Sequence, residues 1–323
     1  MPQDSTLLML NADTVASFLD PTDVLAAVRE AFTLHSQQRG RVFPVIREQL
    51  DTGGIFGIKA GDVQSEGLLG FKAAGFWPRN RDLGGEPHQA TVMLVDPATG
   101  RPRCIIDGNA ITTARTGAVG ALGLQQLARP DASRICVFGT GVQAASQLNY
   151  ALRVRPGITT VRYVSVDGKR HEDFERQFRQ RTDLIHAVGA DAAVAQSDVI
   201  ITATPGAGAL FDVAAVQPGT HLNCVGADTK GKRELPEGML ARVRLVVDDA
   251  VQARQIGETQ WAPATPCIEM GDLISGVTTL QRAHDDITLF DMTGLALQDL
   301  TVARLILEKA RSNCAGLEVA WPW

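Results

Sequence analysis

The chain has 323 residues, of which 45% are apolar and 21% are charged, and its formal net charge is −5. This composition is ordinary for a globular protein and excludes intrinsic disorder. The mildly negative charge argues against nucleic acid or an anionic membrane as a partner, and no stretch approaches the roughly 20 apolar residues of a membrane span. Chains of this length usually divide into domains with separate hydrophobic cores, so we expect two domains.

The cysteines and histidines do not predict a metal site. The five cysteines lie far apart and form no C-x-x-C pair, so neither a zinc site nor a disulfide framework is expected. No group of His, Asp and Glu has the spacing of metal ligands. The N-terminal segment is acidic and has no basic run before an apolar stretch, so we expect no secretory signal and a cytoplasmic protein.

The first part of the chain predicts an α+β domain. Asp20 and Pro21 open a helix whose apolar stripe continues toward Gly40. Short β-rich runs then alternate with glycine-containing turns, which is typical of an antiparallel sheet. The expected strands are residues 43–46, 55–59, 68–74, 90–95 and 103–106. A helix at residues 112–128, capped by Thr112 or Thr113, closes this domain.

At Arg134 the pattern changes to alternating strands and helices, which predicts a doubly wound parallel sheet. The expected strands are residues 134–138, 160–166, 198–202, 221–225, 244–247 and 287–291. A long helix at residues 295–311 is expected to return to the first domain. The predicted fold class is therefore α/β, with a Rossmann-type domain at residues 119–299 and an α+β domain at residues 1–118 with 300–323.

A dinucleotide motif lies between an expected strand and an expected helix. Gly139, Gly141 and Ala144 form G-x-G-x-x-A. The first glycine permits a tight turn, the second lets a pyrophosphate approach the backbone, and the small third residue lets the helix pack on the strand. The helix N-terminus offers N–H groups to the phosphates. The alternative is a glycine turn in an α/β domain that binds no nucleotide.

Asp167 follows the next strand, where its carboxylate can accept hydrogen bonds from the ribose hydroxyls of NAD. Its charge would repel a 2′-phosphate, so NAD(H) is favoured as the cofactor. Lys169 and Arg170 lie just beyond and can instead hold a 2′-phosphate, which leaves NADP(H) as the alternative. Further expected cofactor contacts lie in the phosphate loop or at strand ends: Val142, Gln143, Thr202, Thr204 and Val225.

Five motifs follow one another along nearly the whole chain. They are residues 70–72 (GFK), 78–80 (PRN), 107–118 (DGNAITTARTGA), 225–235 (VGADTKGKREL) and 290–299 (FDMTGLALQD). Together they resemble the ornithine cyclodeaminase/mu-crystallin family. This resemblance implies NAD(H) or NADP(H) binding, amino-acid chemistry through imine intermediates, and a homodimer formed through a substrate-binding first domain.

The resemblance also implies roles for individual residues. Arg47 matches the family's carboxylate-binding arginine, Lys72 its active-site lysine, and Asp228 its acid/base carboxylate. Arg115 matches an arginine between the substrate carboxylate and the cofactor phosphate, in the first turns of the expected helix. The structural alternatives are solvated charges, ion pairs or a turn aspartate. The cofactor contacts that rest on family position are Arg115, Thr116 and Met292.

Lys59 departs from the family's ornithine-specific members, which carry a glutamate thirteen residues before the lysine that matches Lys72. A cation there would repel a terminal ammonium and favour a distal carboxylate, as in iminosuccinate. Lys59 is therefore an expected substrate-binding residue. The alternative is a solvent-facing side chain, since strand faces alternate.

These features predict an NAD(P)H-dependent imine or ketimine reductase, or an amino-acid dehydrogenase. Such an enzyme interconverts an imino acid, or a 2-oxo acid plus ammonia, with an L-amino acid. One dicarboxylic example is iminosuccinate and aspartate. Lys72 and Asp228 are the expected catalytic residues, and Arg47, Lys72 and Arg115 are expected to hold the substrate carboxylate. Two alternatives stay open: an ornithine-type cyclodeaminase that releases ammonia, and a non-catalytic mu-crystallin-like ligand-binding protein.

Overall fold

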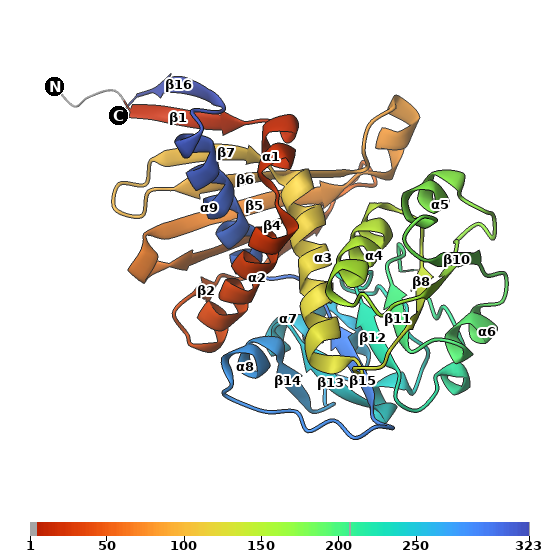
Figure 1. The fold of residues 1–323 in the computed structure, drawn as a ribbon. Coiled ribbons are helices and arrows are strands. Elements are labelled where there is room, and N and C mark those ends of the chain that lie inside the picture. Colours follow the sequence, from red (N-terminus) through yellow and green to blue (C-terminus); the bar gives the residue numbers. More distant parts are fainter. Residues whose placement is uncertain (1–4, 207, 323) are drawn as a thin grey trace. The chain divides into compact units, whose positions relative to one another are not determined.

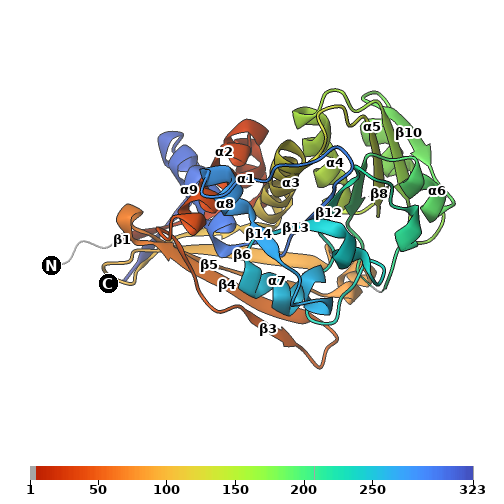
Figure 2. The same ribbon diagram turned by 90° about the horizontal axis from the view of Figure 1, so that it is seen from below.

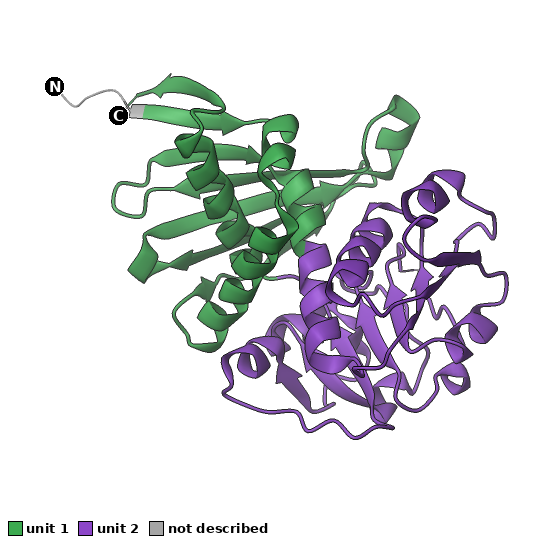
Figure 3. Ribbon diagram, in the orientation of Figure 1, with its two compact units in different colours: residues 1–115, 295–323 green, residues 116–294 purple. Residues whose placement is uncertain are grey.

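The computed structural model describes residues 5–206 and 208–322 (Figure 1). The chain forms two compact units, shown in separate colours in Figure 3. Unit 1 comprises residues 1–115 and 295–323, and unit 2 comprises residues 116–294. The boundaries expected from the sequence, 118/119 and 299/300, lie a few residues further along the chain. The difference matters for residues 295–299, which belong to unit 1.

Unit 1 contains a mostly antiparallel sheet in the order β16-β1-β7-β6-β5-β4-β2, and β3 also pairs with β4. The strands are β1 (Ser5–Leu10), β2 (Arg41–Val42), β3 (Ile46–Gln49), β4 (Ile55–Val63), β5 (Leu68–Phe76), β6 (His88–Val95), β7 (Pro102–Asp107) and β16 (Leu317–Trp321). The strand predicted at residues 43–46 is wrong, because Pro44 has no N–H for a ladder bond and the chain there separates β2 from β3. The sequence also missed β1, which runs parallel to β7.

Three helices lie on one face of this sheet (Figures 1 and 2): α1 (Ala12–Phe18), α2 (Pro21–Ser36) and α9 (Ala296–Ser312). Asp20 caps α2 as predicted, since its Oδ1 accepts hydrogen bonds from the N–H groups of Thr22 and Asp23 at 2.8 and 3.2 Å. Helix α9 is buried at every position over residues 296–303 and on one side only beyond them. It covers the face of the unit 1 sheet on which the three helices lie, which we call the inward face.

Helix α3 (Gly108–Leu127) starts earlier than the sequence predicts. Thr112 and Thr113 lie inside it, so the prediction that either caps it is wrong. Asp107 supplies the capping carboxylate, because its Oδ1 accepts a hydrogen bond from the N–H of Ala110 at 3.4 Å. Arg115 consequently lies in the interior of the helix rather than in its first turns, and the chain passes from unit 1 to unit 2 after it.

Unit 2 is the predicted doubly wound domain. Its sheet is parallel throughout, in the order β10-β9-β8-β11-β12-β15-β13-β14. The strands are β8 (Arg134–Phe138), β9 (Thr160–Val164), β10 (Asp183–His186), β11 (Val199–Thr202), β12 (His221–Cys224), β13 (Val243–Val247), β14 (Cys267–Glu269) and β15 (Ile287–Asp291). The α/β fold class is confirmed, although β10 and β14 were not predicted.

Buried apolar clusters on the two faces of this sheet form the core of unit 2. One includes Phe138, Leu222 and Leu289, and the other includes Val137 and Tyr163. The remaining helices are α4 (Val142–Val154), α5 (Glu172–Phe178), α6 (Ala190–Ala195), α7 (Ala250–Ile256) and α8 (Met270–Ser275). Short 3₁₀ helices are η1 (Gln64–Glu66), η2 (Pro78–Leu83), η3 (Val213–Ala215), η4 (Met239–Arg242) and η5 (Glu258–Trp261). Within the described residues, no helix has the length and apolar character needed to cross a membrane.

Candidate active site

Lys72 belongs to a row of residues that crosses the inward face of the unit 1 sheet. Strand register places Lys59 on one side of it and Val92 on the other, and the row continues to Ile106 and Leu10. Residues directly opposite each other on paired strands share a face. Lys72 is 4% exposed and Lys59 is 9% exposed. The alternative in which Lys59 points to solvent is therefore wrong.

Asp299, in the first turn of α9, joins Lys72 to Arg115. Its Oδ1 accepts hydrogen bonds from Lys72 Nζ at 2.8 Å and from Arg115 Nε at 3.1 Å. Lys72 Nζ also donates to Thr112 Oγ1 at 3.2 Å, and Arg115 Nη1 donates to Gln298 Oε1 at 3.1 Å. Asp299 Oδ2 is buried and has no hydrogen-bond partner among the described residues. A carboxylate near a helix N-terminus is also stabilised by the helix dipole.

The burial of this cluster changes its titration. The pKa of Lys72 is lowered to about 8, because burial and the charge of Arg115 together outweigh the raising effect of Asp299. For Asp299, burial by itself would raise the pKa. The positive charges of Arg115 and Lys72 outweigh that effect, so the pKa of the Asp299 carboxyl lies below its usual range. Lys72 is therefore a cation at neutral pH that can give up its proton under mildly alkaline conditions.

Arg47 adds a further cation to the same face. It lies on β3 directly opposite Gly57, and Gly57 is two residues before Lys59 on β4, so all three share a face. A Cβ at Gly57 would lie 3.1 Å from Cδ of Arg47, which shows the arginine side chain passing over this glycine. The charge of Arg47 also lowers the pKa of Lys72.

The structure thus collects Arg47, Lys59, Lys72 and Arg115 on the inward side of unit 1, together with Asp299. The motifs alone did not reveal Asp299, Gln298 or Thr112 as members of this cluster. A usable signal was present for Asp299, since a carboxylate on the buried side of an apolar helix requires a cationic partner. The pairing itself was hidden because Lys72 and Asp299 are far apart in the sequence.

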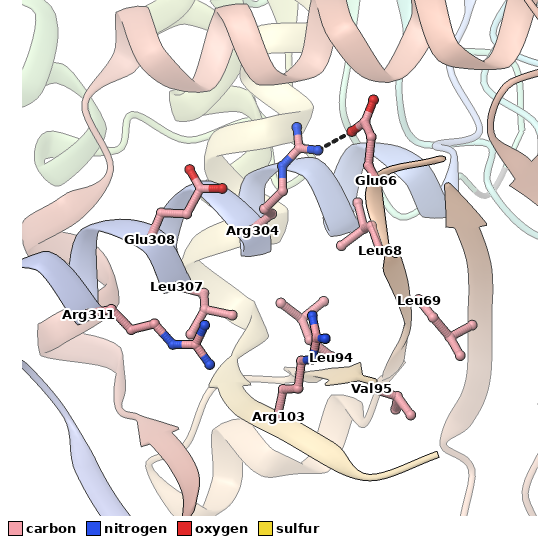
Figure 4. Close-up of a pocket in the computed structure, with 11 residues that line it drawn as sticks. Glu66, Leu68, Leu69, Leu94, Val95, Arg103, Arg304, Leu307, Glu308 and Arg311 are labelled. Carbon is pink, nitrogen blue, oxygen red and sulfur yellow. Dashed lines mark hydrogen bonds and ion pairs between the residues drawn. The ribbon is translucent and has the colours of Figure 1, made fainter. Parts of the chain in front are cut away.

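A separate pocket of unit 1 lies under the C-terminal half of α9 (Figure 4). Arg304 in this pocket forms ion pairs with Glu66 and Glu30, and Arg103 pairs with Asp96 at 2.5 Å. Carboxylates within unit 1 therefore already neutralise these guanidinium groups. The described residues that line the pocket include none of the predicted site residues, so we assign it no part in the chemistry.

The phosphate loop of unit 2 fits a dinucleotide. Gly139 has φ = +101°, and a Cβ there would lie 2.5 Å from the carbonyl oxygen of Ala203, so only glycine suits the turn. A Cβ at Gly141 would meet no described atom within 4 Å, which leaves open space where the pyrophosphate is expected. Ala144 is buried, as close packing of helix on strand requires. Gln143 Oε1 is buried without a hydrogen-bond partner among the described residues.

Asp167 lies in a closed turn after β9, with its carboxylate about half exposed. Its Oδ1 accepts hydrogen bonds from His171 Nε2 at 2.9 Å and from the N–H of Lys169 at 3.1 Å. The hydrogen bond from His171 is the main reason that the pKa of Asp167 falls to about 2. Val166 and Val188, just beyond the ends of the neighbouring strands β9 and β10, are both strongly exposed. This combination of a charged carboxylate and exposed apolar side chains fits the adenosine half of NAD.

Asp228 lies in the loop after β12, where its Oδ1 accepts hydrogen bonds from Lys232 Nζ at 2.7 Å and from Thr229 Oγ1 at 3.1 Å. Glu234 holds this loop against the loop after β11. Its Oε2 accepts from the N–H of Gly226 at 2.8 Å, and its Oε1 accepts from the N–H of Thr204 at 2.7 Å. Glu234 is fully buried and was missed as a site residue, although it lies in a quoted motif.

Two more buried acidic residues, Glu258 and Asp291, extend these contacts. We call Glu234, Glu258 and Asp291 the carboxylate brace. Glu258 Oε1 accepts from the N–H of Glu234 at 2.6 Å, and Asp291 accepts from the N–H groups of Glu258 and Thr259 at 3.0 and 2.8 Å. Burial raises the pKa of Glu258 to about 8 and that of Asp291 to about 7. The brace therefore links the end of β15 to the loops that carry Thr204 and Asp228.

The remaining predicted cofactor residues lie in unit 2 as well, apart from Arg115 in unit 1. Thr202 and Met292 are buried, as is Thr116, whose carbonyl oxygen accepts a hydrogen bond from Gln147 Nε2 at 2.7 Å. Val225 is partly buried and donates its N–H to Thr202 O at 2.9 Å. Val142 is exposed at the first position of α4. Their contacts with a cofactor remain predictions.

Comparison with known proteins places the chain in a family. The model of the ornithine cyclodeaminase/mu-crystallin family matches residues 6–314. The iminosuccinate reductase of Paracoccus denitrificans is 33% identical over an alignment of 325 positions, which covers 97% of this chain and 99% of that protein. Its crystal structure in complex with NAD⁺ matches 98% of this chain and 99% of its own with a TM-score of 0.89 and 31% identity. An archaeal alanine dehydrogenase dimer with bound NAD matches with a TM-score of 0.91 and 30% identity, covering 98% and 99% of the two chains.

The chain therefore belongs to the ornithine cyclodeaminase/mu-crystallin family, and the resemblance inferred from its five motifs is confirmed. The predicted class is also confirmed: the chain is an NAD(P)-dependent oxidoreductase acting on C=N or CH–NH₂ bonds, with NAD favoured as the cofactor.

Proposed function

We propose that the chain reduces an imino dicarboxylic acid with NADH to form the corresponding amino acid, with iminosuccinate and aspartate as the first pair to test. The observation that carries this proposal is the collection of Arg47, Lys59, Lys72 and Arg115 on the inward side of unit 1, together with Asp299. Gathered cations favour an anionic ligand, and a buried cation is most stable beside a carboxylate. A substrate with two carboxylates matches this concentration of positive charge.

The position of Lys59 favours a dicarboxylate over other imino acids. Guanidinium groups match carboxylates in shape, so Arg47 and Arg115 suit the carboxylate next to the reacting carbon. Lys59 then suits the distal carboxylate. The same cation would repel the terminal ammonium of ornithine or lysine, which disfavours the cyclodeaminase alternative.

Reduction of an imine requires a hydride at the carbon and a proton at the nitrogen. Reduced nicotinamide supplies the hydride when it is bound. Clamping of the substrate by the cationic cluster fixes the imine carbon in one orientation. With a pKa of about 8, Lys72 is charged at neutral pH and close enough to its titration point to donate a proton. Asp228 is the second candidate for moving a proton to or from the amine.

The experiment is a panel of oxo acids with ammonia and NADH, run beside preformed pyrroline- and piperideine-carboxylates. Oxaloacetate should give the highest rate of NADH oxidation, and chromatography should detect aspartate in equal amount. Faster turnover of pyruvate or of a cyclic imine would overturn the dicarboxylate assignment. Ammonia release from ornithine or lysine without net NADH would support the cyclodeaminase, and NADH binding without any turnover would support the ligand-binding protein.

We also propose that the protein is a homodimer formed through the outward face of the unit 1 sheet. A cross-strand row on that face consists of partly or largely exposed apolar residues: Ala60, Phe71, Met93, Ile105 and Met9. A continuous apolar row on an open sheet is typical of an interface. Its proposed occupant is a second copy of this chain, since the similar archaeal alanine dehydrogenase is a dimer. Light scattering should give twice the chain mass, and Met93→Glu should give a monomer. A monomeric wild type would contradict the proposal.

A further inference from the structure

The turn after β9 carries both an acid and a cation, in the part of a dinucleotide fold that selects between NAD and NADP. In dinucleotide folds an arginine near the ribose accommodates the 2′-phosphate of NADP, whereas an acid at the strand end selects NAD. This chain has both residue types, Asp167 and Arg170, three positions apart. The structure shows that Arg170 is already bound to another group. Its Nε donates to Glu175 Oε1 at 3.0 Å and its Nη2 donates to Glu175 Oε2 at 2.8 Å.

Glu175 is the fixed member of this pair. Its Oε1 also accepts a hydrogen bond from the hydroxyl of Tyr163 at 2.5 Å, and Tyr163 is fully buried on β9. The same hydroxyl accepts the N–H of His171 at 3.3 Å. The side chain of Glu175 is 17% exposed and that of Arg170 is 69% exposed. The carboxylate is therefore anchored by the core, and the long arginine side chain is drawn to it.

The acid of the same turn has side-chain contacts of its own. Asp167 accepts hydrogen bonds from the N–H of Lys169 and from the ring of His171, and the side chain of Glu175 makes neither of these bonds. In this turn the carboxylate of Asp167 is therefore half exposed, whereas the guanidinium of Arg170 is paired with Glu175. The two-pronged geometry of the Arg170–Glu175 pair matters, because a bidentate pair restricts the orientation of the guanidinium more than a single contact does.

We propose that Glu175 is a cofactor-specificity residue, which holds Arg170 away from the 2′-phosphate position and so reinforces the selection of NAD by Asp167. Arg170 is then a latent phosphate ligand, and the chain has two separable barriers to NADPH. This inference concerns the cofactor and does not depend on the identity of the imino acid.

The test compares the dissociation constants of NADPH and NADH by fluorescence titration of the full-length protein, in the absence of any imino acid. The variants are Asp167→Ser, Glu175→Gln, the double variant, and the double variant with Arg170→Ala. In Glu175→Gln the amide oxygen can still accept the Tyr163 hydroxyl, so the fold should survive, and thermal unfolding checks this. Asp167→Ser should tighten NADPH binding about tenfold, and Glu175→Gln in that background should add about fivefold, since the released guanidinium is solvent-exposed.

The matched control is Arg170→Ala. In the double variant it should remove the gain contributed by Glu175→Gln. In the wild type it should leave NADPH affinity unchanged within about twofold, because the guanidinium is already engaged. The proposal is overturned if Glu175→Gln gives no gain over Asp167→Ser, or if the gain survives Arg170→Ala. A fluorescence titration reads binding alone, so failure of the imine reductase assay would leave this result interpretable.

Discussion

Two buried clusters, one in each unit, satisfy their acidic groups in opposite ways. In unit 1, several cations surround one carboxylate, and Asp299 directly binds Lys72 and Arg115. In unit 2, Glu234, Glu258 and Asp291 are buried carboxylates that accept hydrogen bonds mainly from backbone N–H groups. Buried acidic groups that bind backbone N–H groups hold loops in place, whereas a concentration of side-chain cations attracts an anionic ligand. This difference supports the proposal that the first set binds the substrate, whereas the second set holds loops of unit 2 in place.

Removal of Lys72 tests the cationic side of this contrast and should have the largest effect. Lys72→Met should lower kcat/KM for the imino acid by about 1,000-fold, because both a proton donor and a carboxylate ligand are lost. NADH affinity should change little, since the phosphate loop and Asp167 lie in unit 2. Steady-state rates measure the loss of kcat/KM, and a fluorescence titration measures the affinity for NADH. Equal losses in both would indicate a general structural defect instead.

Asp299→Asn should change the pH profile as well as the rate. Burial lowers the pKa of Lys72 to about 8, and Asp299 is the group that opposes this effect. Without that carboxylate the Lys72 pKa falls further, so the neutral amine appears at lower pH. The decline of kcat/KM at alkaline pH should begin at a lower pH in the variant, with a loss of about 10- to 100-fold near pH 8. Substrate speciation is the same for both proteins, so an unmoved profile would show that Asp299 is only structural.

The carboxylate brace of unit 2 should affect the free energy of unfolding rather than substrate specificity. The pKa of Glu258 is raised from 4.5 to about 8, so the folded state keeps a proton that the unfolded chain releases. Stability therefore falls as pH rises between these two values. We expect the free energy of unfolding to drop by roughly 1–3 kcal/mol from about pH 6 to about pH 8. In Glu258→Gln the slope of urea-unfolding stability against pH should be shallower, and an unchanged slope would exclude Glu258 as its cause.

Most of unit 2 could be predicted from the sequence because its central strands are continuous apolar runs between helices. The strand β8 and the strand β15 agree with their predicted limits. Strand β10 was missed because it has only four residues and its two apolar residues, Leu184 and Ile185, are adjacent, so the sequence does not alternate; β14 was missed because three residues give no periodic signal. In unit 1, β1 pairs with β7 and β16, which are distant in sequence, so local patterns could not reveal these pairings.

The site was predictable to the extent that its residues lie in motifs. Lys72 and Arg115 lie in two of the five motifs, and Lys59 was singled out as a departure from the family pattern. Asp299 was in a motif too, but its role depends on a contact between β5 and α9 that no local pattern encodes. The Glu175–Arg170 pair was likewise invisible, because propensity does not indicate which of several nearby charges meet.

The most direct test of the central claim is the ratio of kcat/KM for oxaloacetate with ammonia to that for pyruvate with ammonia, measured in the wild type and in Lys59→Met. Pyruvate lacks the distal carboxylate and so serves as the internal control. The account predicts that the wild type prefers oxaloacetate, and that the variant loses this preference by at least about tenfold with little change for pyruvate. A ratio that is the same in both proteins would contradict the assignment of Lys59, and with it the dicarboxylate substrate.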